Sequence, residues 1–291
     1  MRVSLFHKII PSFIRIPLAV ILRKTGISTA VQSALCLSEA RSLARVFKPS
    51  GVNHDLSKVL IVCAHFNHLD WLPGCVDSVL AQTHQNFQLI IVDDSSTADG
   101  AETALTTQAA RDPRVKAIQL EENSGAYVAR NTALEAADND WTHITFIDPD
   151  DLAYPGWLSH NLEVLGGNEG SVRPVLERWT PDLKKMKSMY FGFCQALHSR
   201  DAFEKAGGFL PVRVSGDAEL LLRLSKLAEA SDTTLVKSFK PSQKMRLHRG
   251  SASQTSLNER KRWLEGRSRE LDNTKSYYET PFTSPWRDCK L

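Results

Sequence analysis

The sequence predicts an α/β fold in which helices cover both faces of a mostly parallel sheet. Short apolar runs rich in β-branched residues alternate with segments whose apolar residues recur at helical spacing. The turns between them are short, as expected of consecutive strand–helix units. Polar residues gather directly after the apolar runs, at the strand ends where such sheets bind ligands.

The regular alternation starts near Lys58 and continues to the strand that ends in Asp148. Strands are expected over residues 59–64, 88–92, 115–120 and 141–147. Helices are expected over residues 69–83, 101–111, 125–137 and 156–165.

After Pro155 the pattern becomes mixed. Residues 171–198 indicate irregular or antiparallel strands, of which the last runs over 190–198. A strand interrupted by Pro241 is expected over 234–247. Helices are expected over 201–206, 217–227 and 258–271. The 291 residues suffice for one large domain or for one domain with a small appendage.

Composition excludes several classes of protein. Hydrophobic residues make up 42% and charged residues 24%, as in globular domains, so a buried core is expected. The formal charge of +3 is too small to indicate nucleic acid as the main partner. The 5 cysteines are scattered and form no CxxC pair, which argues against a disulfide framework or a zinc site. A reducing, cytoplasmic location is expected.

The first 48 residues stand apart, because no acidic residue precedes Glu39 while basic and apolar residues alternate. Residues 1–24 could therefore lie on an anionic membrane surface, at the inner face of the membrane. Pro11 and Pro17 would break one continuous amphipathic helix, which favours a helical arm packed on the main domain. The apolar run of residues 16–22 is too short to span a membrane.

The triplet Asp148-Pro149-Asp150 follows a strongly apolar strand. In extended backbone, residues two apart point to the same side, so both carboxylates could converge on one divalent cation. Oxygen ligands suit Mn²⁺ or Mg²⁺ shared with substrate phosphates. The alternative is an acidic turn in which Asp151 caps the next helix.

Two further clusters follow other strands. Asp93 and Asp94 could accept hydrogen bonds from a base or ribose hydroxyl, and Phe66 could stack on a base or belong to the core. Gly125 permits close approach of the backbone to a ligand. Arg130, further along the same helix, could reach a phosphate or form a surface salt bridge.

Residues 59 to about 162 resemble family 2 glycosyltransferases, which have the GT-A fold. The matching motifs occur in the family's order. They are Phe66-Asn67, the segment 78–87, Ile91-Val-Asp-Asp-Ser-Ser96, Asn123-Ser-Gly125 with Ala129-Arg-Asn131, and Phe146-Ile-Asp-Pro-Asp-Asp151.

The resemblance implies a role for each matching residue. Asp94 would contact the nucleobase, with Phe66 near it. Asp150 would be the main metal ligand, while Asp93 and Asp148 would support the nucleotide and ribose.

The resemblance continues more loosely over about 190–252 and implies a catalytic base. Many family members carry an acidic pair whose second acid is the base, and here Gly216 replaces the first acid. Asp217 matches the base, with Glu219 as the alternative. His248 lies in a segment that can supply a histidine near the diphosphate, and is a candidate metal or phosphate ligand.

The resemblance implies an inverting glycosyltransferase that uses Mn²⁺ or Mg²⁺. Its partners would be a nucleoside-diphosphate sugar and a glycan or lipid-linked acceptor, as in surface polysaccharide synthesis. Two alternatives stay open, a nucleotidyltransferase and a non-catalytic scaffold. The expected segments are an arm (1–48), a linker (49–57), a donor-binding half (58–154), a smaller mixed acceptor half with the base (155–255), and a C-terminal helix and tail (256–291).

Overall fold

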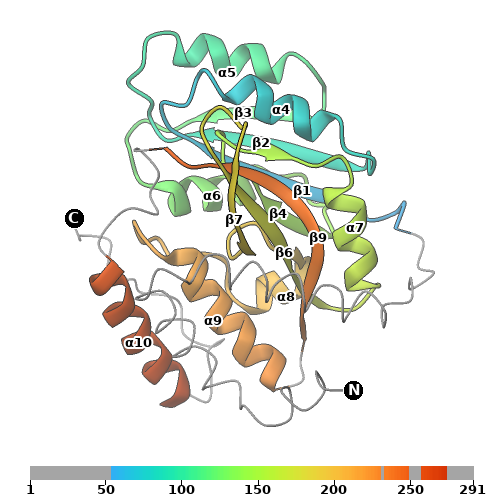
Figure 1. Ribbon diagram of the computed structural model, residues 1–291, viewed down its shortest axis with the longest axis vertical. Helices are drawn as coiled ribbons and strands as arrows, with labels where there is room; N and C mark the ends of the chain where they lie inside the picture. The colour runs from blue at the N-terminus through green and yellow to red at the C-terminus, as the bar shows by residue number, and fades with distance from the viewer. Residues whose placement is uncertain (1–53, 231–232, 249–256, 274–291) are drawn as a thin grey trace.

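The computed structural model describes residues 54–230, 233–248 and 257–273 (Figure 1). The predictions for the arm of residues 1–48 and for the tail after residue 273 lie outside this part of the chain. So does the predicted membrane contact of residues 1–24.

The first half of the sheet is parallel. Strand β1 (Val59–His65) lies between β2 (Phe87–Asp93) and β4 (His143–Phe146), and β3 (Val115–Gln119) pairs with the other side of β2. The connections between consecutive strands are α4 (Leu72–Leu80), α5 (Ala101–Ala109) and α6 (Ala126–Glu135). Helices can pack on both faces of this sheet, because successive residues of a buried strand point to opposite faces.

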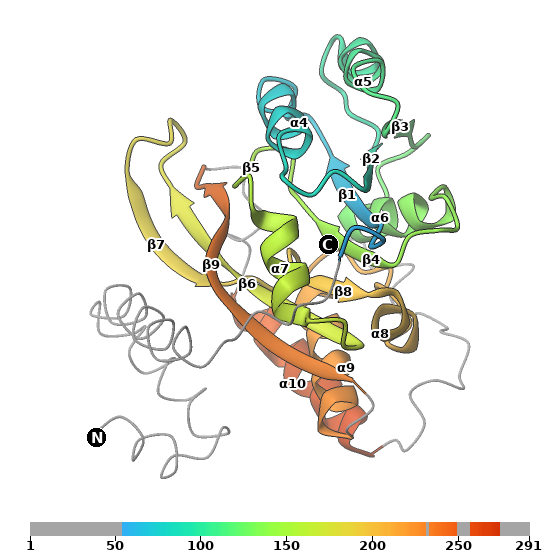
Figure 2. The same ribbon diagram turned by 90° about the vertical axis from the view of Figure 1, so that its right-hand side faces the viewer.

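Two hydrophobic cores lie on opposite faces of this sheet. Val59, Ile61 and Cys63 of β1 belong to the core under α4, α5 and α7 (Trp157–Leu165). Leu60 and Val62 belong to the core under α6 and the later helices. The views of Figures 1 and 2 show these two helical layers with the sheet between them. The prediction of helices on both faces is confirmed.

The second half of the sheet is mixed. It contains β6 (Gly170–Trp179), β8 (Leu197–Ser199), β9 (Thr234–Arg246) and the short β5 (Leu152–Ala153). In the described part, the strands follow the order β3-β2-β1-β4-β8-β6-β9-β5, and β7 (Met186–Phe191) pairs with β6. Helices α8 (Arg200–Lys205), α9 (Gly216–Glu229) and α10 (Leu257–Asn273) complete the fold (Figure 2).

The predicted single strand over 190–198 is wrong. Strand β7 ends at Phe191 and β8 begins at Leu197. Both pair with β6, but residues 192–196 bulge out opposite residues 173–174 of β6, and β8 also pairs with β4. The Gly192 N–H donates to Pro174 O at 2.8 Å, and a Cβ at Gly192 would lie 2.7 Å from Leu176 Cδ1. The close approach at Gly192 marks the point where the chain leaves β6.

The strand predicted over 234–247 is present as β9, but Pro241 shifts its register without interrupting it. The ladder between β6 and β9 shifts register where Val175 pairs with Pro241. Proline cannot donate to a ladder, so the strand bulges there. Within the described residues, every helix is too short or too polar to cross a bilayer.

Candidate active site

The loops that follow β1 and β2 meet at one edge of the sheet. The Asp94 N–H donates to His65 O at 2.8 Å. The amide oxygen of Asn67 accepts the N–H groups of Thr97 and Ala98, each at 2.9 Å. The predicted meeting of polar residues at the carboxyl ends of the strands is therefore present.

Asp94 joins this edge to the start of α6. Its carboxylate accepts the N–H of Ser124 at 2.7 Å and the N–H of Gly125 at 2.8 Å. Burial raises the pKa of Asp94, and these two N–H donors oppose the rise. Gly125 has φ 94° and ψ 154°, a conformation open almost solely to glycine. Asp94 and Gly125 thus shape one loop together.

Asp93 lies beneath this loop. Its side chain is fully buried and accepts from Ser96 Oγ at 2.5 Å and from Ser96 N at 2.9 Å. His65 Nδ1 lies 2.6 Å from Asp93 Oδ1, the same oxygen that accepts from Ser96 Oγ. Asp93 therefore supports the loop from below, whereas Phe66, which is 40% exposed, stands at its surface.

Asp148 differs from the prediction. Residues 148–151 form a turn closed by the Asp151 N–H to Asp148 O at 3.0 Å, so the side-chain alternation of extended backbone does not apply. The Asp148 carboxylate accepts from Arg130 Nη2 at 2.9 Å and from Gln195 Nε2 at 3.2 Å. It lies in an ion pair, away from the partners of Asp150.

Arg130 is a buried residue, which corrects the predicted surface salt bridge. It is 5% exposed, and its guanidinium lies over the rings of Tyr127 and Phe209 at 5.1 and 5.6 Å. Its guanidinium pairs with Asp148 at 2.9 Å. Burial raises the pKa of Asp148, Arg130 opposes the rise, and the charges of Asp150 and Asp217 add to it. Arg130 connects Asp148 with Asp217, because it pairs with Asp148 and lies over the ring of Tyr127, whose hydroxyl donates to Asp217.

Asp150 meets two histidines. Its Oδ2 lies 2.8 Å from His248 Nε2. One ligand atom from each of His68, Asp150 and His248 falls within 4.8 Å of the others. Trp71 packs on the His248 ring at 4.8 Å. This trio could hold a divalent cation with two imidazoles and one carboxylate.

His68 is a residue that the sequence interpretation missed. It lies in the loop after β1, within His65-Phe-Asn-His68. The signal available was a histidine directly after a strand whose end was already expected to face a ligand. The pairing with His248 depends on a contact between distant segments, which the sequence does not reveal.

The two candidates for the base lie in different surroundings at the start of α9. Asp217 Oδ1 accepts from Tyr127 Oη at 2.8 Å. Glu219 is fully buried and pairs with Arg223 Nη2 at 2.6 Å and Arg267 Nη2 at 3.0 Å. The geometry favours Asp217, because Glu219 is enclosed by cations inside the fold.

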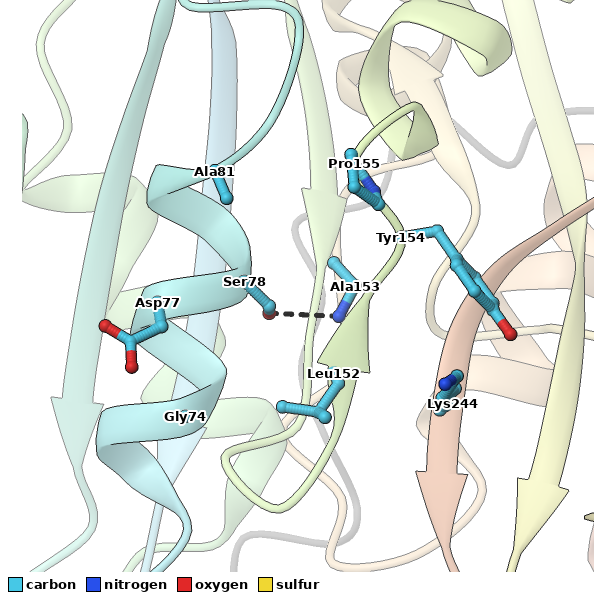
Figure 3. Close-up of a pocket in the computed structure, with 9 residues that line it drawn as sticks. All are labelled: Gly74, Asp77, Ser78, Ala81, Leu152, Ala153, Tyr154, Pro155 and Lys244. Carbon is cyan, nitrogen blue, oxygen red and sulfur yellow. Dashed lines mark hydrogen bonds between the residues drawn. The ribbon is translucent and has the colours of Figure 1, made fainter. Parts of the chain in front are cut away.

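A shallow pocket of about 470 Å³ lies elsewhere on the surface, between α4 and β5 (Figure 3). Ser78 Oγ accepts the Ala153 N–H across it at 3.0 Å. Leu152, Tyr154 and Lys244 line its other side. It contains none of the predicted site residues.

Comparison with known proteins identifies relatives in polymer synthesis. TuaG of Bacillus subtilis (strain 168), a glycosyltransferase whose name refers to teichuronic acid biosynthesis, is 40% identical over 107 residues, 37% of this chain and 41% of TuaG. The teichoic acid poly(glycerol phosphate) polymerase of Staphylococcus epidermidis is 29% identical over 149 residues, 50% of this chain and 20% of that protein. The matched segments span less than half the length of these relatives.

Solved structures show the same fold. TarS 1–349 of S. aureus in complex with UDP-GlcNAc matches with a TM-score of 0.60 at 14% identity, over 75% of this chain and 68% of TarS 1–349. The mannosyltransferase PcManGT of Pyrobaculum calidifontis, in complex with GDP-Man and Mn²⁺, matches with a TM-score of 0.57 at 17% identity, over 89% and 76%. The predicted GT-A fold is confirmed.

The family comparison agrees with the motifs. The model of glycosyl transferase family 2 matches residues 60–205, half of the 291-residue chain. The match includes the loops of Asp94, Gly125 and Asp150 described above. The chain therefore belongs to glycosyl transferase family 2.

Proposed function

We propose that this protein transfers a sugar from a nucleoside diphosphate to an acceptor hydroxyl, with inversion at the anomeric carbon and with a bound divalent cation. The observation that carries the proposal is the His68–Asp150–His248 trio in the same neighbourhood as Asp148 and Asp217. A cation ligand set and a candidate base then lie at one edge of the sheet.

The nucleotide would bind at the loop shaped by Asp94 and Gly125. The Asp94 carboxylate is ordered by two backbone donors, and Phe66 beside it offers an exposed ring for stacking on the base. Asp93 would act indirectly by holding that loop. The UDP-GlcNAc and GDP-Man named for the two structural neighbours support a nucleotide-sugar donor.

The donor set of the trio fits a divalent cation, because its three ligand atoms already converge. Asp150, His248 and His68 would hold the ion, and Asp148 would stay with Arg130. When bound, the ion would neutralise charge on the leaving diphosphate. Mn²⁺ in the PcManGT complex supports this assignment, and two imidazoles favour Mn²⁺ over Mg²⁺.

Asp217 would accept the proton of the acceptor hydroxyl as that oxygen attacks the anomeric carbon. Attack opposite the leaving diphosphate inverts the anomeric centre in one displacement. Tyr127 holds one oxygen of Asp217 and leaves the other oxygen for this proton.

The acceptor would be a growing glycan or a lipid-linked glycan of a surface polysaccharide. The teichuronic and teichoic acid names of the two curated relatives support this class. Membership of a glycosyl transferase family disfavours the nucleotidyltransferase alternative.

The decisive test is calorimetric titration of the full chain with UDP, GDP, CDP and dTDP, with and without Mn²⁺. One diphosphate should bind with an affinity that depends on Mn²⁺, and the matching sugar donor should be slowly hydrolysed. Asp150→Ala should abolish both. Asp182→Ala is the matched control, because Asp182 is a half-exposed carboxylate in the turn before β7.

Folded protein that binds none of the four diphosphates would overturn the donor site and favour the scaffold alternative. A donor that binds but is never transferred or hydrolysed would overturn the catalytic part alone. Asp217→Asn should separate donor binding from catalysis, since this variant should lose turnover and keep donor binding.

A further inference from the structure

Tyr127 contacts the two consecutive residues Gly216 and Asp217 at the start of α9. Its hydroxyl donates to Asp217 Oδ1 at 2.8 Å. A Cβ at Gly216 would lie 2.9 Å from Tyr127 Cγ and 3.0 Å from both Cδ atoms. The first approach is shorter than real Cβ contacts, and the other two are tighter than most of them. All three involve the rigid base of the ring, which cannot swing away as a flexible side chain would.

The absence of a side chain at Gly216 is therefore explained by packing. Its backbone is not in the left-handed region, so strain does not require glycine there. The ring of Tyr127 is 8% exposed and packs on Phe209 at 5.3 Å. The space beside α9 that a larger residue 216 would need is filled by this ring.

The hydroxyl of Tyr127 is a dependable donor. Burial raises its pKa well above the usual value, and the charge of Asp217 adds to the rise, so the phenol keeps its proton. Its ring position is set by α6, whose first turn also carries the Gly125 N–H to Asp94. Helix α6 therefore contributes both to the loop of Asp94 and Gly125 and, through Tyr127, to the position of Asp217.

We infer that Tyr127 is a positioning residue for the Asp217 carboxylate, and that Gly216 is its size-matched partner. Gly216 stands where the resemblance places the family's first acid, and its lack of a side chain leaves room for the Tyr127 ring that donates to Asp217. The inference rests on the proposed role of Asp217 as the base.

The first test is Tyr127→Phe, which keeps the ring and removes only the hydroxyl. Loss of a hydrogen bond to a charged group predicts a fall in kcat of about 10- to 100-fold, with donor KM changed less than about twofold. Tyr154→Phe is the matched control, because Tyr154 Oη donates to Glu177 at 2.7 Å outside the site. The control should keep the wild-type kcat.

The second test asks whether Tyr127 acts through Asp217. In an Asp217→Asn background, Tyr127→Phe should lower the residual turnover by less than about twofold, since the group that it orients is gone. A full additional loss in that background would overturn the positioning role. So would a wild-type kcat for Tyr127→Phe in an enzyme that Asp217→Asn inactivates.

The third test needs no activity. Gly216→Ala should lower the Tm in the wild-type background and should cost clearly less in a Tyr127→Ala background. Equal costs in both would overturn the size match. If wild-type protein transfers no sugar at all, the proposed function fails, while this thermal cycle still decides the pairing of Tyr127 with Gly216.

Discussion

His248 Nε2 lies 2.8 Å from Asp150 Oδ2, although 98 residues separate them in the chain. The contact joins the turn after β4 to the end of β9, and both side chains are 13% exposed. Asp151 supports the same junction, because its Oδ1 accepts the Arg246 N–H at 2.9 Å. The geometry of the candidate cation site therefore depends on the second half of the fold.

The trio of His68, Asp150 and His248 predicts that the protein binds Mn²⁺ in the absence of any nucleotide. The full chain should be titrated with Mn²⁺ alone while the signal of the free ion is monitored by electron paramagnetic resonance. The titration should show one site. His68→Ala and His248→Ala should each weaken binding at least about tenfold, because each removes one of three protein ligands. Mg²⁺ should compete poorly for a site with two imidazoles.

His160→Ala is the control for this experiment. His160 lies on α7 with its side chain 17% exposed and 3.6 Å from Glu163, apart from the trio. Mn²⁺ binding that survives His68→Ala unchanged would remove His68 from the site, and leave Asp150 and His248 as the candidate ligands.

Much of the fold could be predicted from the sequence because its signals are local. The apolar runs at 59–64 and 88–92 and the polar residues after them correspond to β1, β2 and their ligand-side ends. The split between β7 and β8 was missed, since it depends on how residues 192–196 bulge away from the shared partner β6. Strand pairing is a tertiary property that local patterns do not carry.

The candidate site was less predictable for the same reason. Asp94, Asp150 and Asp217 were identified from motifs, but their partners come from distant segments. His68 with His248, Arg130 with Asp148, and Tyr127 with Gly216 are pairs that the sequence does not bring together. The extended geometry expected for residues 148–150 is not observed, because the chain turns directly after β4.

Arg130→Met should destabilise the fold by about 2–4 kcal/mol, because it leaves the Asp148 charge without its partner. The Arg130 side chain is 6% exposed and that of Asp148 is 32% exposed, so solvent screens only part of the loss. Urea unfolding measures the effect. Lys184→Met is the control, since Lys184 and Asp182 are 84% and 54% exposed and their pair should contribute at most about 0.5 kcal/mol. Equal effects of both changes would contradict the buried role of Arg130.

Gly125→Ala should cost about 1–3 kcal/mol of stability and also weaken nucleotide binding. A Cβ there would meet Arg213 Cγ only at 3.8 Å, so the cost comes from the backbone conformation and not from crowding. The shifted backbone would also withdraw the N–H that Asp94 accepts. Urea unfolding and nucleotide calorimetry measure the two effects.

Gly100→Ala is the matched glycine variant. Gly100 has φ 82° and ψ 7°, in the left-handed region that alanine tolerates at about 1 kcal/mol, and a Cβ there meets nothing within 4 Å. It should lose some stability and keep nucleotide binding. If Gly125→Ala leaves nucleotide affinity at the wild-type value, the loop of Asp94 and Gly125 does not form the nucleotide site.

The buried, neutral ring of His198 predicts that the free energy of unfolding decreases as the pH falls below neutrality. It is 1% exposed, its Nδ1 lies 2.8 Å from Ser171 Oγ, and burial lowers its pKa to about 3. An unfolded chain takes up this proton below about pH 6.5, whereas the folded chain does not until about pH 3. The neutral ring therefore favours folding fully above pH 6.5, and this contribution is lost as the pH falls toward 3.

Between pH 7 and pH 5 the loss from His198 should be about 2 kcal/mol, at roughly 1.4 kcal/mol per pH unit below 6.5. His198→Gln removes the titrating group and keeps a polar partner for Ser171. Urea unfolding at both pH values should show a smaller decrease for the variant, whatever its stability at pH 7. His143, whose pKa burial lowers to about 4, remains in both proteins and contributes to a residual slope, as do His68 and His160, whose pKa values burial also lowers. An identical decrease in the two proteins would show that His198 is already protonated, or already solvated, in the folded chain.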